Sequence, residues 1–556
     1  MTGGRPTRSY RSAPPTTEGS ASRFFQVVAL DPRFRSEIRE PERAGRDTIL
    51  PMEDHFDRDA CYRALSTRDP RFDGRLFVGV TSTGIYCRPV CPARTPRIEN
   101  CRFFPSAAAA QQAGFRPCLR CRPETAPDLG SWRGTSNTVS RALALIAEGA
   151  LDGGEAGVAA LAERLGVGDR QLRRLFRQHL GASPVAIAQT RRILFAKQLI
   201  QETELSMAEV ALAAGFGSIR RFNETFRALY RQPPSALRRR DSATAIQVPA
   251  EAGVTLRLRY RRPYDWQAII THLQVRAVAG VETVSGGIYR RTVRHDGRLG
   301  TVEVADDPAR SSLAVTIRFP CVRALPTILA GVRRVFDVGA DVEAIGAHLS
   351  SDPMLAPLVA RWPGLRVPGG WDGFEMAIRA ILGQQITLAA ARGLAGQLVE
   401  LCGDPLPDGA GAFPGLTHAF PSPERVAAAD LSPLRMPQAR RNALKALAEA
   451  AVADPHLFRP YGSIEDAVAR LRSIAGIGEW TAQYIALRAL REPDAFPASD
   501  VGLLRGAAGA NGRPSPAELL RRAEAWRPWR AYAAHYLWMA DAEGGCAPAE
   551  NEEQAA

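Results

Sequence analysis

Most of the chain places apolar residues three and four positions apart, the spacing of an amphipathic helix, and only a few stretches alternate apolar and polar residues. From Thr138 to about Arg240 the pattern is helical, with short turns that contain glycine. The stretches VTLRLRY and SLAVTIRF alternate as half-buried strands do, and they predict an α+β region. The helical pattern returns from Trp371 to about Gly544. We therefore predict a multidomain fold, mainly α with α+β parts.

Composition shifts along the chain predict its divisions. Residues 1–51 are rich in Arg, Pro, Ser and Thr without sustained periodicity, so we expect a flexible leader, with Met52 as an alternative start. Two polar stretches, 127–137 and 241–253, indicate linkers. The expected units are 52–127, 138–240, 254–363 and 364–544, followed by a polar tail at 545–556.

Charge and hydropathy narrow the class of protein. The 556 residues carry a net charge of +14, which favours a polyanionic partner such as nucleic acid, although a basic surface without a particular partner has the same charge. No apolar run approaches the roughly 18–20 residues of a membrane span, and the first 20 residues lack a secretory signal. We expect a cytoplasmic protein. Lysine occurs only at Lys197 and Lys445.

Four of the nine cysteines form two close pairs. The spacing is C-x3-C, then 26 residues, then C-x2-C, which is typical of tetrahedral zinc in a reducing compartment. The predicted ligands of one zinc ion are Cys87, Cys91, Cys118 and Cys121. The alternative is four buried or unpaired thiols. The remaining five are expected to be small buried hydrophobes: Cys61, Cys101, Cys321, Cys402 and Cys546.

The flanks of these pairs suggest more than a structural clip. FDGRLFVGVTSTGIYCRPVCPAR and FFPSAAAAQQAGFRPCLRCRP resemble the N-terminal zinc domain of the Ada family, bacterial sensors of methylated DNA. The resemblance implies that Cys87 accepts a methyl group from a DNA methylphosphotriester. Zinc keeps a thiol deprotonated, and methylation would lower the negative charge of the site and strengthen its binding to phosphates. Arginines that could hold the DNA backbone are Arg88, Arg94, Arg97, Arg116, Arg120 and Arg122, with an ordinary solvated side chain as the favoured alternative for each one taken singly. A purely structural zinc domain stays open.

The helical middle contains two similar units. AALAERLGVGDRQLRRLFRQHLG and SMAEVALAAGFGSIRRFNETFRALYRQ each indicate helix, glycine turn and arginine-bearing helix, joined by a long helix. They resemble the AraC-type DNA-binding domain. Candidate base readers are Arg170, Gln171 and Arg174 in the first unit and Ser218, Arg220 and Asn223 in the second. Leu172, Leu175, Phe222 and Phe226 are expected in the core. The Pro-Cys-His-Arg site of Ada's methylguanine-oxygen transferase domain does not occur in this sequence.

The last unit carries a glycine hairpin followed by an acid. In LRSIAGIGEWTAQYIALRAL, Gly476 and Gly478 would let backbone N–H groups approach a DNA phosphate, with Thr481 nearby. DAFPASDVGLLRGA follows, with Asp500. Together with FEMAIRAILGQQITLAAARGLAGQLVE, these stretches resemble the AlkA-type 3-methyladenine DNA glycosylases II of the helix-hairpin-helix class. The resemblance implies that Asp500 is the catalytic carboxylate, although a helix cap is the simpler role.

The same resemblance marks further site residues. Trp480, Tyr484 and Trp538 are candidates for binding a cationic base, with core packing as the alternative. Gln385 falls where AlkA-type enzymes carry an apolar residue that fills the gap left by a flipped base, so an altered substrate preference is expected. Trp480 occupies the position of the lyase lysine, and the four-cysteine iron–sulfur motif is missing, so we expect a glycosylase without strand cleavage.

The predicted protein is an alkylation-response protein with two linked functions. It would sense methylphosphotriesters, activate transcription of repair genes together with RNA polymerase, and hydrolyse alkylated bases from DNA. Its DNA partners would be alkylated duplexes and promoter sequences at the bacterial nucleoid, and nothing in the sequence requires more than a monomer. The main alternative is a transcriptional regulator whose glycosylase half only binds DNA.

Overall fold

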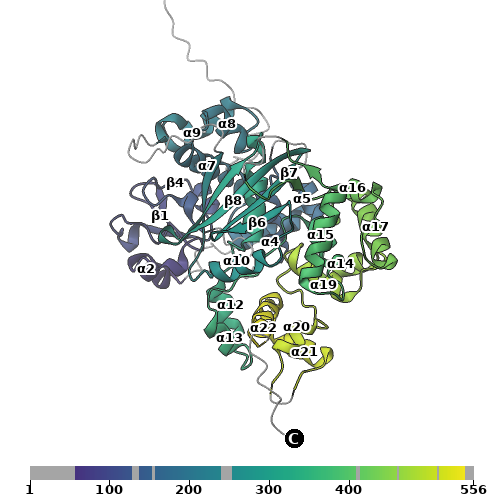
Figure 1. Ribbon diagram of the computed structural model, residues 1–556. Helices are drawn as coiled ribbons and strands as arrows, with labels where there is room; N and C mark the ends of the chain where they lie inside the picture. The colour runs from purple at the N-terminus through teal and green to yellow at the C-terminus, as the bar shows by residue number, and fades with distance from the viewer. Residues whose placement is uncertain are drawn as a thin grey trace, which may run out of the picture. The chain divides into compact units, whose positions relative to one another are not determined.

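The computed structural model describes residues 57–127, 137–152, 157–238, 253–407, 413–459, 463–509 and 512–544. The expected leader, Met52, the tail and most of both linkers lie outside these residues. Within the described residues no helix combines the length and apolar character needed to cross a bilayer. The described helices and strands follow the order shown in Figure 1.

The first segment forms a small sheet because its short apolar strands are separated by tight turns. The strand order is β3-β1-β2-β4, with β1 antiparallel to both neighbours and β4 parallel to β2. Its elements are α2 (Arg58–Ser66), β1 (Phe77–Val80), β2 (Ile85–Cys87), β3 (Cys101–Phe104), α3 (Ala107–Gln112) and β4 (Arg116–Pro117). Cys61 and Cys101 are buried against the sheet, as expected for isolated cysteines.

The helical middle is the tandem arrangement that the periodicity predicts. Its helices are α4 (Asn137–Ala147), α5 (Val158–Arg164), α6 (Asp169–Leu180), α7 (Pro184–Glu202), α8 (Met207–Ala213) and α9 (Ile219–Tyr230). Helices α6 and α9 have the same length and bury equivalent positions: Leu172, Phe176 and Leu180 in α6, and Phe222, Phe226 and Tyr230 in α9. Leu175 is half-buried against the same core as Leu172, so the expected core residues are confirmed.

An antiparallel sheet of five strands follows. Both stretches with alternating polarity are strands, and they pair with each other from Val254 with Ile317 to Arg259 with Ser312. The order is β5-β9-β8-β7-β6. The elements are β5 (Val254–Arg259), α10 (Trp266–Gln274), β6 (Glu282–Ser285), β7 (Ile288–His295), β8 (Arg298–Asp307), β9 (Ser312–Arg318) and α11 (Leu325–Val335). The strands and both helices contribute side chains to one apolar core.

The last region is helical around a second large apolar core. Its helices are α12 (Val342–Leu349), α13 (Ala356–Arg361), α14 (Gly373–Leu382), α15 (Leu388–Cys402), α16 (Pro423–Ala428), α17 (Gln438–Ala453), α18 (Ile464–Arg472), α19 (Glu479–Arg488), α20 (Val501–Gly506), α21 (Pro516–Ala523) and α22 (Arg530–Gly544). One short ladder, β10 (Asp404–Pro405) with β11 (His418–Ala419), interrupts them.

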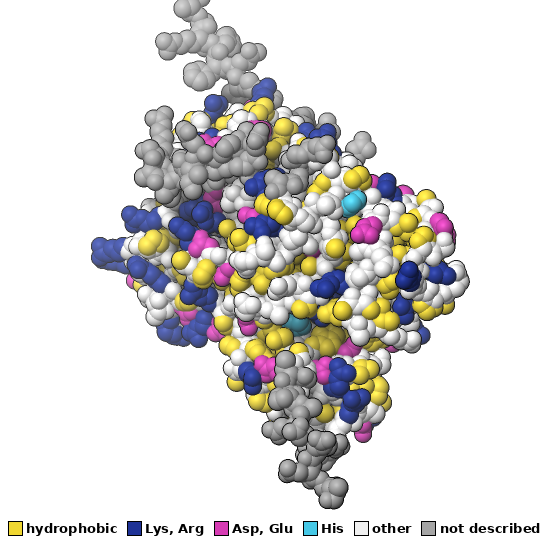
Figure 2. Space-filling view, in the orientation of Figure 1, with side chains coloured by type: hydrophobic (Ala, Val, Ile, Leu, Met, Phe, Trp, Pro, Cys, Tyr) yellow, Lys and Arg dark blue, Asp and Glu magenta, His cyan; other side chains and the backbone are white. Residues whose placement is uncertain are grey.

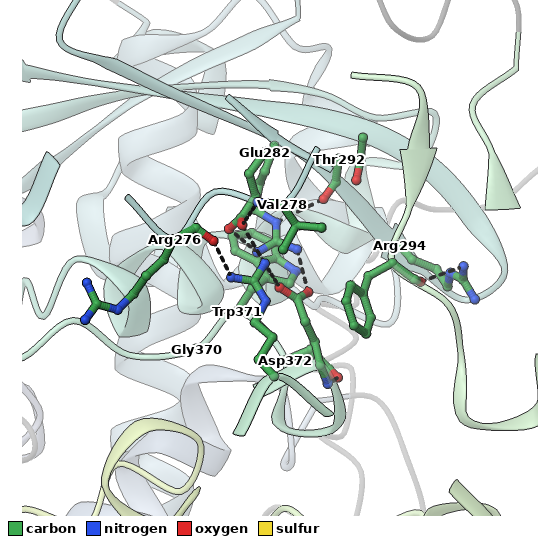
Figure 3. A network of polar contacts seen from close by, with 12 residues as sticks. Arg276, Val278, Glu282, Thr292, Arg294, Gly370, Trp371 and Asp372 are labelled. Atoms are coloured by element: carbon green, nitrogen blue, oxygen red, sulfur yellow. Dashed lines mark hydrogen bonds and ion pairs between the residues drawn. The ribbon is translucent and has the colours of Figure 1, made fainter. Parts of the chain in front are cut away.

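A buried network of charges joins the five-stranded sheet to α14. Arg291 of β7 lies 2.7 Å from a carboxylate oxygen of Glu375, and Arg379 pairs with both Glu375 and Glu282. The Tyr289 hydroxyl donates to Glu282 at 2.6 Å. Figure 3 shows this network around Glu282, beside the loop of Trp371 and Asp372. Two arginines balance two glutamates, so the network fixes the direction of α14 without a net buried charge.

Candidate functional site

Strand pairing brings the two cysteine pairs together. Strands β2 and β4 run parallel, with Tyr86 opposite Pro117, so the next residues, Cys87 and Cys118, leave the sheet at the same end. The Cys118 N–H donates to the Tyr86 carbonyl at 3.0 Å and fixes this register. The turns that follow each strand carry Cys91 and Cys121 back toward them. The four sulfurs all lie within 4.8 Å of one another.

This sulfur cluster has the donors and spacing that zinc requires. A tetrahedral zinc ion with Zn–S bonds of about 2.3 Å holds its four sulfurs roughly 3.8 Å apart. Contact with the Cys118 sulfur, and then with those of Cys121 and Cys91, raises the pKa of the Cys87 thiol. Four thiolates this close repel one another, so the fully deprotonated cluster requires a cation. The residues present therefore fit the predicted zinc site.

Cys87 differs from the other three ligands. Cys91, Cys118 and Cys121 are buried, whereas Cys87 is only half-buried. Backbone N–H groups of Arg120 and Arg88 donate to the sulfurs of Cys118 and Cys121, each at 3.4 Å. No such bond to the Cys87 sulfur is found in the described segments. The Cys87 sulfur is therefore more accessible to solvent than the other three. As a thiolate it would also share less of its negative charge with backbone N–H groups than the sulfurs of Cys118 and Cys121 do.

The six arginines near the cluster differ in exposure. Arg116 and Arg122 are half-buried, and Arg122 pairs with Glu124 and Glu202. Arg94, Arg97 and Arg120 are exposed, and Figure 2 shows Lys and Arg side chains gathered over the segment of α2, β1 and β4. Arg88, by contrast, is 6% exposed. Its guanidinium pairs with Asp73 and donates to the Cys121 carbonyl at 3.1 Å and the Thr125 hydroxyl at 2.7 Å. Its expected role as a contact to the DNA backbone is therefore wrong, because it braces the cysteine turn from inside.

The two proposed recognition helices begin directly after the glycine turns, as the sequence predicted. Gly168 precedes α6, and Ser218 caps α9 by accepting the Arg221 N–H at 3.1 Å. Arg170, Gln171 and Arg174 are exposed along α6. Arg220 is exposed on α9 but pairs with Glu224 at 2.8 Å, and Asn223 is half-buried. Within the described part of the chain, Arg170 and Arg174 of the first helix thus form no ion pair, while the second helix presents a mixed surface.

The two hairpin glycines serve different purposes. Gly476 has φ +86°, and a Cβ placed on it would lie 2.4 Å from the Ala443 Cβ of α17, so the fold itself requires glycine there. Gly478 has an ordinary φ and caps α19, and a Cβ on it would meet nothing within 4 Å. The space in front of Gly478 is open at a helix N-terminus. Such a terminus favours an anion.

Asp500 is held by two tryptophans. Its Oδ1 accepts the Trp538 Nε1–H at 2.8 Å and the Leu503 backbone N–H at 3.0 Å, and its Oδ2 accepts the Trp480 Nε1–H at 2.8 Å. The residue is therefore both the cap of α20 and the centre of an aromatic cluster. Donation from three N–H groups fixes the orientation of both carboxylate oxygens.

The three candidate aromatic residues lie together, and none is fully buried. The rings of Trp480 and Tyr484 stack with centroids 5.3 Å apart, and the Tyr484 and Trp538 rings meet edge to face at 6.2 Å. Core packing alone would bury them. Their partial exposure beside Asp500 fits a surface that binds a flat ring.

The loop that carries Gln385 is fixed in an unusual conformation. Gln385 is exposed, with φ +56°, a left-handed value that a residue other than glycine rarely adopts. The preceding Gln384 side chain donates to the Gly476 carbonyl and to the Thr481 hydroxyl, both at 3.1 Å. Arg440 donates to the Gln384 carbonyl at 2.5 Å. Thr481 is 3% exposed, so its side chain supports this loop and only its backbone N–H is available near the helix start.

Some of these residues could not be found from the sequence. Gln384 and Arg440 have no motif of their own, and their role depends on contacts with residues about 60 to 100 positions away. Gly502 is another, because a Cβ there would lie 3.1 Å from both the Asp500 carboxylate and the Trp538 ring. The only sequence signal for Gly502 was its position two residues after the candidate acid Asp500.

Comparison with known proteins agrees with this geometry. Four family models match: the metal binding domain of Ada at 60–124, a helix-turn-helix domain at 161–240, the AlkA N-terminal domain at 255–372, and the HhH-GPD superfamily of base excision DNA repair proteins at 378–531. The Ada match covers all four cysteines, so the cluster is a zinc site. The helix-turn-helix match makes this a DNA-binding protein.

Three curated relatives cover different parts of the chain. A “DNA-3-methyladenine glycosylase 2” of Escherichia coli is 36% identical over 51% of this chain and 96% of its own length. The “Bifunctional transcriptional activator/DNA repair enzyme Ada” of Escherichia coli is 33% identical over 28% of this chain and 42% of its own length. A “Probable bifunctional transcriptional activator/DNA repair enzyme AlkA” of Mycobacterium tuberculosis is 44% identical over 88% of this chain and 97% of its own length. With such a relative over nearly its whole length, the chain belongs to the family of AlkA-type bifunctional transcriptional activators and DNA repair enzymes.

Proposed function

We propose that this chain couples a methyl-accepting transcriptional activator to a DNA glycosylase for alkylated bases. The observation that carries the enzymatic half is Asp500, a carboxylate oriented by two indole N–H groups inside a half-exposed aromatic cluster. The four-cysteine cluster with one accessible sulfur supports the sensor half. The divisions expected from the sequence, 52–127, 138–240, 254–363 and 364–544, are retained as the proposed boundaries.

The sensor reaction is a methyl transfer to Cys87. When bound, zinc keeps the thiols of the site deprotonated at neutral pH. The Cys87 sulfur attacks the methyl carbon of a methylphosphotriester, an S–C bond forms, and the O–C bond breaks, which leaves an ordinary phosphodiester. The hydrogen bonds on the sulfurs of Cys118 and Cys121 and the burial of Cys91 support Cys87 as the nucleophile. The thioether is stable, so the reaction is stoichiometric.

Methylation then works as an electrostatic switch. A divalent ion with four thiolates carries a formal charge of −2, which repels DNA, and one methyl group reduces it to −1. The exposed Arg94, Arg97 and Arg120 could then hold the backbone more tightly. Arg170, Gln171 and Arg174 on α6, with Arg220 and Asn223 on α9, are the proposed promoter contacts, and Ser218 contributes as a cap. An activator must engage the transcription machinery, so RNA polymerase is the proposed protein partner. We further propose that the protein acts at the chromosome as a monomer.

The glycosylase reaction breaks the bond between the sugar C1′ and the damaged base. Asp500 stabilises the positive charge that develops on the sugar and orients the water that attacks C1′, while the base leaves with the bonding electron pair. Trp480, Tyr484 and Trp538 form the surface for the flipped base. Gln385 is the proposed occupant of the gap in the duplex, because its loop is preset by Gln384 and Arg440. Gly476, Gly478 and the Thr481 N–H would hold the phosphate beside it.

The enzyme is proposed to act without a lyase step. A lyase forms a Schiff base between a lysine amine and the sugar. The two lysines of the chain both have other partners. Lys197 is fully buried and pairs with Glu124 at 2.8 Å. Lys445 donates to the Ala427 carbonyl at 2.7 Å and also to that of Ala429. Neither amine is free to attack a sugar, so the product is an intact abasic site.

The test of the enzymatic half is Asp500→Asn. Asparagine keeps the helix cap, so the fold and DNA binding should persist while base release from methylated DNA falls about 10²–10³-fold. Asp541→Asn is the matched control, since Asp541 is a nearby carboxylate that pairs with Arg505 and makes no bond to the two indoles. Unchanged release by Asp500→Asn would instead support a regulator whose glycosylase half only binds DNA.

A further inference from the structure

One helix of the glycosylase region places a cation directly behind the aromatic cluster. Trp480, Tyr484 and Arg488 stand four residues apart on α19 and therefore share one face. The Arg488 guanidinium lies 5.8 Å from the Tyr484 ring centroid and 5.1 Å from the Trp538 ring centroid. Trp480 and Arg488 occupy opposite sides of Tyr484 along the helix. The face of Trp538 away from Arg488 is therefore the better one for a base.

Arg488 is an isolated buried charge. It is 2% exposed, its Nη1 donates to the Pro368 carbonyl at 2.7 Å, and the Tyr484 hydroxyl is a further hydrogen-bond partner. Its Nε has no partner, and across the described segments no carboxylate lies within ion-pair distance of it. Burial lowers its pKa to about 10, so the guanidinium remains protonated at neutral pH. A buried charge without a counterion is costly for a fold.

The surroundings of Arg488 do not compensate its charge. A cavity of about 30 Å³ beside it is also lined by His272, Arg276 and Tyr484. Glu282 and Glu375 line it too, but their charges are paired with those of Arg291 and Arg379. His535 is 5% exposed, its Nδ1 has no partner, and its ring meets those of His272 and Trp538 edge to face. Burial, together with the charges of Arg488 and Arg276, holds the pKa of His535 well below its usual range. The nearest carboxylates are therefore already paired with other arginines, and the positive charge of Arg488 acts on the aromatic cluster without a counterion of its own.

We propose that Arg488 sets the balance between uncharged and cationic damaged bases, by favouring release of the uncharged ones. The proposal rests on the glycosylase function assigned above. Asp500 lies on one side of the aromatic cluster and Arg488 on another, so the cluster stands between a fixed negative and a fixed positive charge. These charges match the separation that develops when the glycosidic bond breaks.

This preference follows from the charge of the leaving group. When C1′–N breaks, the bonding electrons go to the base, the sugar becomes positive, and a water oxygen bonds to C1′ and loses its proton. An uncharged base leaves as an anion, which Arg488 stabilises before the base takes up a proton. A base methylated on a ring nitrogen is already cationic and leaves as a neutral molecule. Arg488 repels that base in the bound state, and this repulsion is only relieved as the base departs, so relative to free enzyme and free DNA Arg488 does not favour its release.

The expected size of the effect is measurable. A base stacked on the face of Trp538 opposite Arg488 would lie roughly 8–9 Å from the guanidinium, given about 3.5 Å between stacked planes. At an effective dielectric constant of about 20, a unit charge at that distance changes a rate by roughly 10- to 30-fold. The effect has opposite signs for binding a cation and for forming an anion, so a ratio of the two rates reports it.

The test measures base release below saturation, where the rate reports kcat/KM, from two duplexes, one with a single cationic N7-methylguanine and one with a single uncharged deaminated adenine. For Arg488→Met, the ratio of uncharged to cationic release should fall at least tenfold. Arg488→Lys should retain a ratio within about threefold of the unmodified protein. Because both rates come from the same preparation, partial loss of folded protein cancels from the ratio.

The matched control is Arg491→Met, three residues away. Arg491 pairs with Asp337 at 2.5 Å, so its charge is already balanced and the ratio should not change. An unchanged ratio in Arg488→Met, or equal loss of both rates, would overturn the proposal and leave Arg488 as a structural residue. Release of neither base by the unmodified protein would overturn both the proposal and the glycosylase function on which it rests.

Discussion

Asp500 combines a structural role and a chemical role at one carboxylate. Its Oδ1 accepts the Leu503 N–H that caps α20, while Oδ1 and Oδ2 each accept one indole N–H. The carboxylate cannot rotate without losing the cap. Two aromatic residues that could bind a base therefore also orient the acid that would act on its sugar.

Trp480→Phe tests this orientation. The substitution keeps an aromatic ring against Tyr484 but removes the N–H that donates to Oδ2. A hydrogen bond to a charged group contributes about 1.5–3 kcal/mol, so we expect single-turnover base release to fall about tenfold or more.

Trp362→Phe is the control for this change. Trp362 is also half-buried, but its ring lies against Arg361 and makes no bond to Asp500. Equal rates for Trp480→Phe and the unmodified protein would contradict the role given to the indole N–H.

Single residues were predictable where a short spacing carries the chemistry. The four cysteines and Asp500 are of this kind, since each stands in a local motif. Arg88 is not, because its burial depends on Asp73 and Thr125 approaching from other parts of the fold. Arg488 was not predictable either, because no sequence pattern distinguishes a buried arginine without an ion pair from the many exposed arginines.

At the scale of elements, the helical hairpin shows how one motif holds two kinds of glycine. Gly476→Ala should destabilise the protein by more than about 2 kcal/mol, because it combines a positive φ with a contact against Ala443. Gly478→Ala should cost less than about 1 kcal/mol, because its Cβ would enter open space. Urea unfolding followed by circular dichroism measures both.

DNA binding by the same two variants completes the comparison. Gly478→Ala should weaken binding to an abasic duplex severalfold while the fold remains intact, since the added methyl group stands where a phosphate would approach. If Gly478→Ala binds that duplex as tightly as the unmodified protein, the hairpin is not the phosphate site.

The network between the five-stranded sheet and α14 gives a prediction about stability. Glu375→Gln removes the charge that balances Arg291 and Arg379, which lie at 2.7 and 2.6 Å from its oxygens. Breaking a buried pair by neutralising one partner costs about 3–5 kcal/mol. Chemical unfolding should report a loss of that size.

Glu303→Gln is the matched control on β8. Glu303 pairs with Arg290 at 2.6 Å, but both side chains are about one-fifth to one-quarter exposed. A partly solvated pair contributes about 1 kcal/mol or less, so its loss should be small. Similar losses for both variants would contradict the importance assigned to the buried network.

Periodicity predicted these elements better than their connections. The helices of the tandem unit and strands β5 and β9 follow directly from the spacing of apolar residues. The sheet order β5-β9-β8-β7-β6 does not, because pairing the first strand with the last depends on contacts between residues about 50 to 60 positions apart. The parallel pairing of β2 with β4, which assembles the zinc site, was hidden for the same reason.

At the scale of the whole molecule, the sensor and the enzyme use separate side chains. None of the described cysteines of the cluster bonds to Asp500 or to its aromatic neighbours. Cys118→Ala should therefore abolish zinc binding and methyl transfer while base release stays within about twofold. Metal analysis and the release assay on one preparation measure both, and a parallel loss of base release would show that the two sites depend on each other.

The most direct test of the account uses the full-length protein and DNA treated with a methylating agent, analysed twice in one tube. Mass spectrometry follows the peptide that contains Cys87, and chromatography follows free 3-methyladenine. We predict one added methyl group on Cys87 together with catalytic release of the base. Methyl transfer without released base, or released base without methyl transfer, would contradict the claim that one chain performs both reactions.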